Sequence, residues 1–126
     1  MGLVEKDFIV RMIEQFAKLL AAALKLRQQG KNDEALEAIH RCTGELYGLD
    51  WDVLAFSDPQ TAAGLLAGKD RIRGYARLLE EESITLRMLG RVLDADRARD
   101  RASAVYREIL KKGADPESEQ AIARLG

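Results

Sequence analysis

One turn pattern occurs twice in this chain, sixty positions apart. In each copy a run of apolar residues with helical spacing leads to a glycine, and an alanine follows five residues later. The copies are Leu26-Arg27-x-x-Gly30-Lys31-x-x-Glu34-Ala35 and Leu86-Arg87-x-x-Gly90-Arg91-x-x-Asp94-Ala95. Glycine readily ends a helix, and a small alanine lets the next helix pack closely against the first. The pattern therefore predicts two helical hairpins, which is an architecture and specifies no partner or reaction.

The composition favours one all-α domain over residues 1–126. Apolar residues make up 47% of the chain and charged residues 33%, with only two prolines, which is typical of a folded helical domain. The formal net charge is −1, with acidic and basic residues interspersed, so we expect no nucleic-acid or membrane partner. One cysteine cannot form an internal disulfide, and no secretion signal or membrane span is evident. We therefore expect a cytoplasmic protein.

Helix-end signals divide the chain into about five or six helices. Asn32 and Asp70 are expected N-caps, and Ser57-Asp58-Pro59-Gln60 has the form of a capping box. Gly74, inside an expected helix, costs about 1 kcal/mol relative to alanine and so suggests a close contact or a later start of that helix. The expected helices cover about 3–29, 33–47, 58–68, 70–89, 92–111 and 115–125, with one short turn near 50–56.

The two hairpins resemble tetratricopeptide repeats. The small residues of that family's pattern fall at matching positions of both copies, which are Ala23 and Ser83, Ala35 and Ala95, and Cys42 and Ala102. The repeat offset is sixty rather than about thirty-four, because the segment 49–68 separates the hairpins. The resemblance implies two tetratricopeptide-like (TPR-like) hairpins, a short-helix connector and a C-terminal capping helix.

Nearly the whole chain also resembles a bacterial family of small helical proteins of unknown function. Members of that family open with a Lys-Asp-(Phe/Tyr)-Ile-x-Arg-Met-Ile-like motif, which here is Lys6-Asp7-Phe8-Ile9-Val10-Arg11-Met12-Ile13. Two further elements match at Leu46-Tyr47-Gly48-Leu49-Asp50 and Leu78-Leu79-Glu80-Glu81-Glu82. This resemblance implies a TPR-like fold and carries no activity with it.

The first helix is too apolar to serve one neighbouring helix. Its apolar residues spread over roughly half of the helix circumference, whereas a surface helix needs a stripe only somewhat wider than about 100°. We therefore predict a protein-interaction module that self-associates through this helix, as a homodimer. The expected contacts are Phe8, Met12, Phe16 and Leu19.

An alternative function follows from the TPR-like arrangement. There the first helix of each hairpin lines a concave groove, and arginines in such a groove suit the carboxylates of an acidic or C-terminal peptide. The residues expected in the groove are Leu24, Arg27, Gln28, Arg77, Ile84, Arg87 and Met88. Two other interpretations remain open. In the first, Arg27 and Arg87 only stabilise the C-terminal ends of their helices, where the helix dipole favours positive charge. In the second, the connector fills the groove with Trp51 or Phe56.

Catalytic and metal sites have little support in the sequence, and we expect no cofactor, no metal and no catalytic residue. Gly64 to Asp70 lacks the spacing and the Ser or Thr of a phosphate-binding loop. His40 and Cys42 are two positions apart on a helix and point in different directions. Glu80, Glu81 and Glu82 are expected on a solvated face, and only as a remote alternative would they serve a hydrolytic enzyme.

The arginines between 71 and 107 do not indicate a nucleic-acid interface. Acidic residues lie among them at ion-pair spacing, and the region offers no aromatic platform on which bases would stack.

Overall fold

The computed structural model describes the backbone of residues 2–126 and the side chains of residues 6–126. Within this part of the chain all regular structure is helical, which confirms the all-α prediction. The helices are α1 (Gly2–Gln28), α2 (Asn32–Tyr47), α3 (Trp51–Ala55), α4 (Pro59–Leu66), α5 (Lys69–Met88), α6 (Val92–Leu110) and α7 (Pro116–Leu125). They account for about five-sixths of the residues.

The two repeated turns have the same backbone geometry. Gly30 and Gly90 adopt φ angles of +78° and +80°, in the left-handed region that favours glycine. In each turn the amide of the following residue donates to the leucine carbonyl five residues earlier, at 2.9 Å. Each glycine therefore closes its helix as the sequence predicts.

Two predicted N-caps are wrong by one or two residues. Asn32 is already the first residue of α2, and Asp70 is the second of α5. The tight turn places Lys31 at the cap position, where its carbonyl accepts from the Ala35 amide at 2.9 Å. At the start of α4, within the predicted capping box, Asp58 is the N-cap residue. Its carboxylate accepts a hydrogen bond from the Thr61 amide at 2.7 Å. That hydrogen bond lowers the pKa of Asp58.

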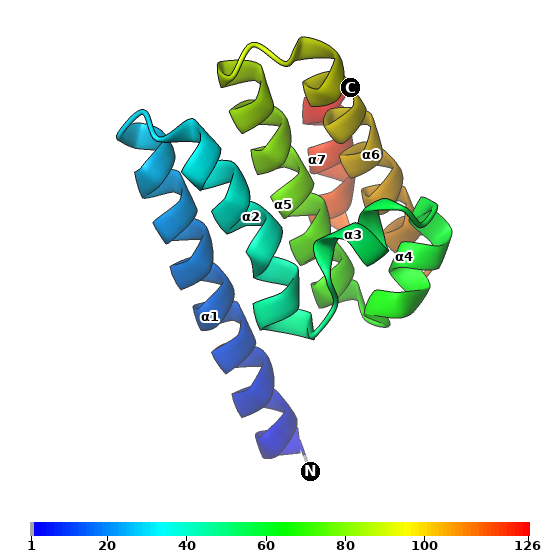
Figure 1. Cartoon of the computed structure of the whole chain (residues 1–126). Coiled ribbons are helices and arrows are strands. Elements are labelled where there is room, and N and C mark those ends of the chain that lie inside the picture. The colour runs from blue at the N-terminus through cyan, green and yellow to red at the C-terminus, as the bar shows by residue number, and fades with distance from the viewer. Residues whose placement is uncertain (1) are drawn as a thin grey trace.

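The helices pack as two antiparallel pairs with α7 added at one end (Figure 1). α1 pairs with α2 and α5 pairs with α6, while α2 also lies against α5 and joins the pairs. The continuous apolar core is centred on α5, where Ile72, Tyr75, Leu78 and Leu79 are buried among residues of α2, α3, α4 and α6. Removing large side chains of this kind from water is the main force that holds such a stack together.

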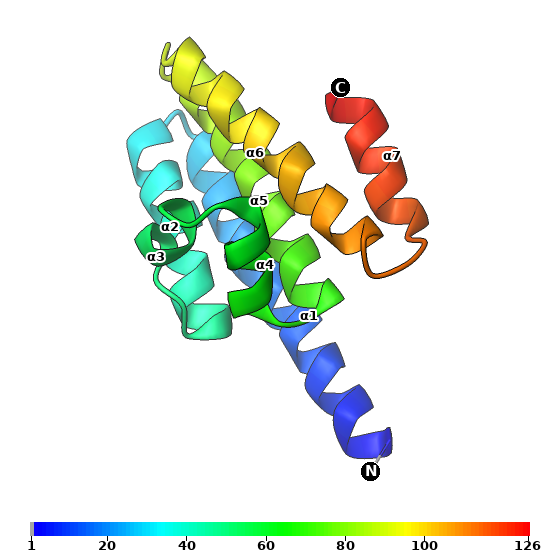
Figure 2. The ribbon, with the colours of Figure 1, turned by 90° about the vertical axis from the view of Figure 1, so that its right-hand side faces the viewer.

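The connector α3–α4 is fixed on the α2 and α6 side of the stack. Trp51 stacks on His40 with ring centroids 4.7 Å apart and meets Tyr75 edge-on at 5.5 Å. Arg101 of α6 donates to the Leu54 carbonyl at 2.5 Å and to the Ser57 carbonyl at 2.6 Å. In Figure 2 the connector and α7 lie on opposite sides of α5. The connector is therefore a fixed element, held away from α7.

Candidate functional site

The apolar face of α1 continues beyond the part of the helix that packs on the rest of the chain. In its C-terminal half, Ala23 is buried and Leu19 and Leu20 pack against the core. The N-terminal half projects past the end of α2 (Figure 1), and there Phe8 and Ile13 are 56% and 58% exposed. One helix face thus serves the core at one end and has no covering helix at the other.

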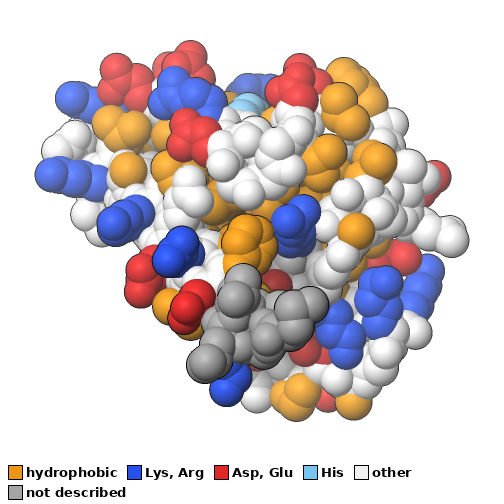
Figure 3. Space-filling model, turned by 90° about the horizontal axis from the view of Figure 1, so that it is seen from below, with side chains coloured by type: hydrophobic (Ala, Val, Ile, Leu, Met, Phe, Trp, Pro, Cys, Tyr) orange, Lys and Arg blue, Asp and Glu red, His pale blue; other side chains and the backbone are white. Residues whose placement is uncertain are grey.

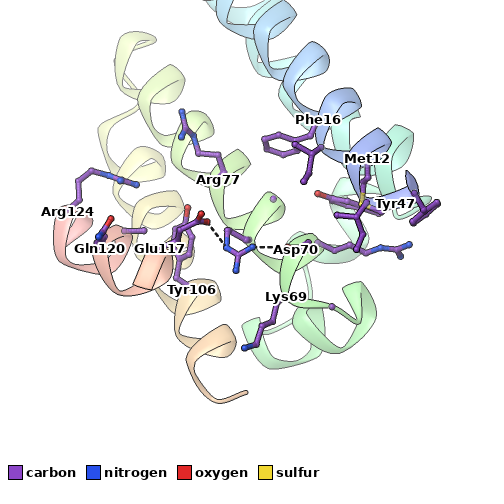
Figure 4. Close-up of a pocket in the computed structure, with 18 residues that line it drawn as sticks. Met12, Phe16, Tyr47, Lys69, Asp70, Arg77, Tyr106, Glu117, Gln120 and Arg124 are labelled. Carbon is purple, nitrogen blue, oxygen red and sulfur yellow. Dashed lines mark hydrogen bonds and ion pairs between the residues drawn. The ribbon is translucent and has the colours of Figure 1, made fainter. Parts of the chain in front are cut away.

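An open groove of about 720 Å³ lies beside this exposed half of α1 (Figure 4). Met12 and Phe16 point into it from α1, Lys69 and Arg77 come from α5, and Arg124 lies on α7 across from α1. The complete lining is Phe8, Ile9, Met12, Ile13, Phe16, Tyr47, Gly68, Lys69, Asp70, Arg71, Arg73, Gly74, Arg77, Tyr106, Glu117, Gln120, Ala121 and Arg124. The groove therefore has an apolar wall from α1 and a polar, mostly basic wall from α5 and α7.

Two of the basic side chains in the groove are neutralised by ion pairs. Arg73 contacts Asp70 at 2.9 Å, Asp115 at 2.7 Å and Glu117 at 3.0 Å. Arg124 donates to the buried Glu80 at 2.5 Å, and this hydrogen bond raises the pKa of the Arg124 guanidinium. These contacts hold α7 on α5, so the two arginines form part of the framework of the groove.

Three other basic side chains of the groove are not engaged by acidic side chains of residues 6–126, so their charge is available to a ligand. Lys69, Arg71 and Arg77 form no ion pair with any side chain of residues 6–126. The guanidinium carbon of Arg71 lies 5.9 Å from the ring centroid of Tyr47, which is a cation–π distance. The groove therefore presents positive charge next to apolar surface.

The floor of the groove depends on a close contact between α2 and α5. A Cβ atom at Gly74 would lie 2.1 Å from the Tyr47 hydroxyl oxygen and 3.3 Å from Phe16. Gly74 thus marks a close contact inside α5 and not a later helix start, which were the two interpretations that the sequence leaves open. Burial raises the pKa of Tyr47 to about 12, so its hydroxyl stays protonated near neutral pH.

The surface at this end of the molecule mixes apolar and basic side chains. Viewed from below in Figure 3, exposed hydrophobic side chains lie between Lys and Arg side chains. Exposed apolar side chains with charged neighbours are a feature of many protein-binding surfaces.

Three of the four predicted self-association residues line the groove. Phe8, Met12 and Phe16 face it, whereas Leu19 lies one turn further along and packs against the core. Ile9 and Ile13 also line the groove, although the prediction did not select them. Both belong to the broad apolar arc, and only the position at which α2 ends reveals which members stay uncovered.

Of the seven predicted peptide-binding residues, one belongs to this groove. Only Arg77 lines it. Arg27 donates to Thr85 at 3.3 Å and contacts the buried carboxylate of Glu81 at 3.4 Å. Arg87 pairs with Asp96 of α6 at 2.6 Å. The remaining four lie away from the groove and are half-buried or exposed, and they are Leu24, Gln28, Ile84 and Met88.

The expectation of a solvated face at Glu80, Glu81 and Glu82 is wrong. Glu80 and Glu81 are buried, and no two of the three glutamates share a partner helix. Glu80 accepts from Tyr106 of α6 and Arg124 of α7, Glu81 pairs with Arg27 of α1, and Glu82 lies 2.5 Å from His40 of α2. Because α5 is central, helices pack on every side of it, so neighbouring carboxylates that diverge by about 100° each meet a partner. They do not converge on a common reaction centre.

His40 and Cys42 both take part in the packing of the protein. His40 stacks on Trp51 and contacts Glu82. Cys42 is buried, and burial raises the pKa of its thiol to about 11, which suppresses the reactive thiolate. Among residues 6–126, no three His, Cys, Asp or Glu side chains are grouped as a metal site requires.

Comparison with known proteins yields no relative for this chain. No family model, no curated protein and no solved structure matches it. None of the described helices combines the length and apolar character needed to cross a membrane. Function must therefore be argued from the groove itself.

Proposed function

We propose that this protein is a non-catalytic protein-interaction module that self-associates through the N-terminal half of α1. One observation carries the proposal: an apolar helix face that packs in the core at one end and remains exposed at Phe8, Ile9 and Ile13 at the other. Covering this face with protein would remove the cost of its contact with water.

The proposed architecture is a TPR-like stack in which α1, α5 and α7 line the concave side. The two hairpins with equivalent turns, and a terminal helix on the same side as α1 and α5, support this arrangement. In such a stack the concave side is the side that binds protein segments.

The test is the oligomeric state of the wild-type protein and of an Ile13→Asp variant. Sedimentation velocity at tens of micromolar should show association of the wild type and a monomer for the variant. Because Ile13 is 58% exposed, the substitution should leave the fold intact, which circular dichroism checks. Gln15→Asp places the same charge on an exposed residue outside the groove and should associate as the wild type does. A stable wild-type monomer would refute the proposal.

A second candidate function is that of an adaptor for acidic peptides, favoured by the basic side chains of the groove. Lys69, Arg71 and Arg77 replace the predicted Arg27 and Arg87 as its carboxylate contacts, because the latter two already have acidic partners. Calorimetry with an acidic helical peptide should give a signal that Arg77→Ala weakens about tenfold. An Arg87→Ala variant is the matched control and should bind unchanged.

A further inference from the structure

The connector presents the most exposed large apolar side chain among residues 6–126. Phe56 is 89% exposed, and Val53, one turn before it, is 50% exposed. On the opposite face of α3, Trp51 and Leu54 are buried. We call Val53 and Phe56 the knob. The burial of the opposite face orients the knob outward, away from the protein's own core.

The backbone that carries the knob is held in place by α6. Arg101 binds the carbonyls of Leu54 and Ser57, which flank Phe56 closely on both sides, and its Nε donates to the Tyr75 hydroxyl at 3.2 Å. A segment whose backbone is already fixed loses less conformational entropy when it binds. These hydrogen bonds therefore prepare the connector for docking.

The connector that carries the knob and the groove have complementary charge. Residues 49–68 contain Asp50, Asp52 and Asp58 and no lysine or arginine. The groove lining contains five basic and two acidic side chains, and its opposite wall is apolar. An element with apolar side chains flanked by carboxylates matches both walls at once.

One copy cannot place its knob in its own groove. α3 packs on α2 and α4 packs on α6, whereas the groove lies among α1, α5 and α7. Figure 2 shows the connector and α7 on opposite sides of α5. The predicted filling of the groove by Trp51 is likewise wrong, because Trp51 is enclosed by His40 and Tyr75.

We propose that self-association is head-to-tail, with Val53 and Phe56 of one copy docked in the α1–α5–α7 groove of the next. This inference rests on the proposed self-association and identifies its partner surface. Such a contact joins two different surfaces, so a bound pair still offers a free groove at one end and a free knob at the other. Assembly then grows beyond a dimer. A groove of about 720 Å³ gives a small interface, for which weak association is typical.

A complementation experiment tests the head-to-tail contact. Phe56→Asp removes the knob and Ile13→Asp removes the groove, and each variant alone should be monomeric at tens of micromolar. Mixed in equal amounts, they should form a one-to-one heterodimer and no larger species, because only one functional groove and one functional knob remain. Leu93→Asp alters another exposed apolar residue, 73% exposed and outside both surfaces, and should assemble as the wild type does.

The outcomes separate this inference from the proposed function. If Phe56→Asp associates as the wild type does while Ile13→Asp is monomeric, or if the mixture stays monomeric, the knob is refuted and self-association through α1 stands. A monomeric wild type refutes both. Several hundred millimolar salt should weaken the wild-type contact several-fold, because exposed charges are screened; association that is insensitive to salt would refute the charge complementarity.

Discussion

The two hairpins share one local design and differ in what surrounds them. Both turns place glycine at nearly the same φ and repeat the same hydrogen bonds. Yet α5 has ten buried residues, whereas among the described side chains of α1 only Ala23 is buried. Equivalent turns thus create equivalent helix pairs, and neighbouring elements decide which pair becomes the core and which provides an open binding face.

The largest expected effect on the free energy of unfolding concerns the leucines at equivalent positions of the two hairpins. Leu79 is 2% exposed in the core, whereas Leu19 is half-buried. Leu79→Ala should lower the free energy of unfolding by about 2–5 kcal/mol, and Leu19→Ala by roughly 1 kcal/mol, because the cost scales with the cavity left behind. Urea unfolding followed by circular dichroism measures both. Equal losses would contradict the division into core and open face.

The next comparison concerns the arginines at equivalent positions. The Arg27 side chain is 15% exposed and pairs with the buried Glu81, whereas Arg87 is 45% exposed and pairs with the exposed Asp96. Arg27→Ala leaves a buried carboxylate without its cation, so we expect a loss of about 2–3 kcal/mol in the free energy of unfolding. Arg87→Ala should cost less than about 1 kcal/mol. The same unfolding measurement would contradict this assignment if Arg87→Ala proved the costlier change.

The turn glycines provide the opposite test, in which the hairpins should behave alike. Gly30→Ala and Gly90→Ala each place a Cβ at positive φ in open space, so the cost is local backbone strain of about 1–2 kcal/mol. We expect the two losses to agree within about 0.5 kcal/mol in thermal and urea unfolding. A clearly larger loss at one turn would show that its hairpin depends on more than local geometry.

The smallest expected effect concerns α7, which covers only the second hairpin. Asp115 caps α7 through the Ser118 amide at 3.1 Å and pairs with Arg73. Asp115→Ala should cost about 1 kcal/mol, as is usual for the loss of an N-cap. The hydrogen bond from the Ser118 hydroxyl, followed by that from Arg73, lowers the pKa of Asp115 below its ordinary 3.8.

The pH dependence of this effect has a defined sign. Since the folded pKa of Asp115 is depressed, its contribution is complete above pH 3.8 and is lost as pH falls through the folded value. The stability difference between wild type and Asp115→Ala should therefore shrink in acid. Unfolding curves at neutral pH and below pH 3.8 test this, and a difference that grew in acid would exclude the ionised cap.

The features predicted correctly from sequence are those set within a few residues of the chain. Gly30 and Gly90 end helices because they adopt positive φ angles, which glycine tolerates and other residues rarely adopt. The apolar arc of α1 was also visible, since helical spacing fixes which side chains share a face.

The errors concern the exact geometry of the turns and residues whose surroundings come from distant parts of the chain. Residue type predicts caps at Asn32 and Asp70, whereas the turns place the cap positions at Lys31 and Gly68. Glu80 and Glu81 have the composition of a solvated face and are nevertheless buried, because their partners Arg124 and Arg27 lie more than forty positions away. A local pattern contains no information about such partners.

The amino-acid sequence by itself determined that this protein is helical, where its turns fall, and that its first helix has an excess of apolar surface. Helix propensity, glycine conformation and side-chain spacing depend only on neighbours along the chain. The tertiary structure alone decided which part of α1 stays exposed and which arginines form no ion pair with another side chain of residues 6–126. Those properties depend on where α2 ends and on how α7 docks, and they arise from contacts between residues far apart in sequence.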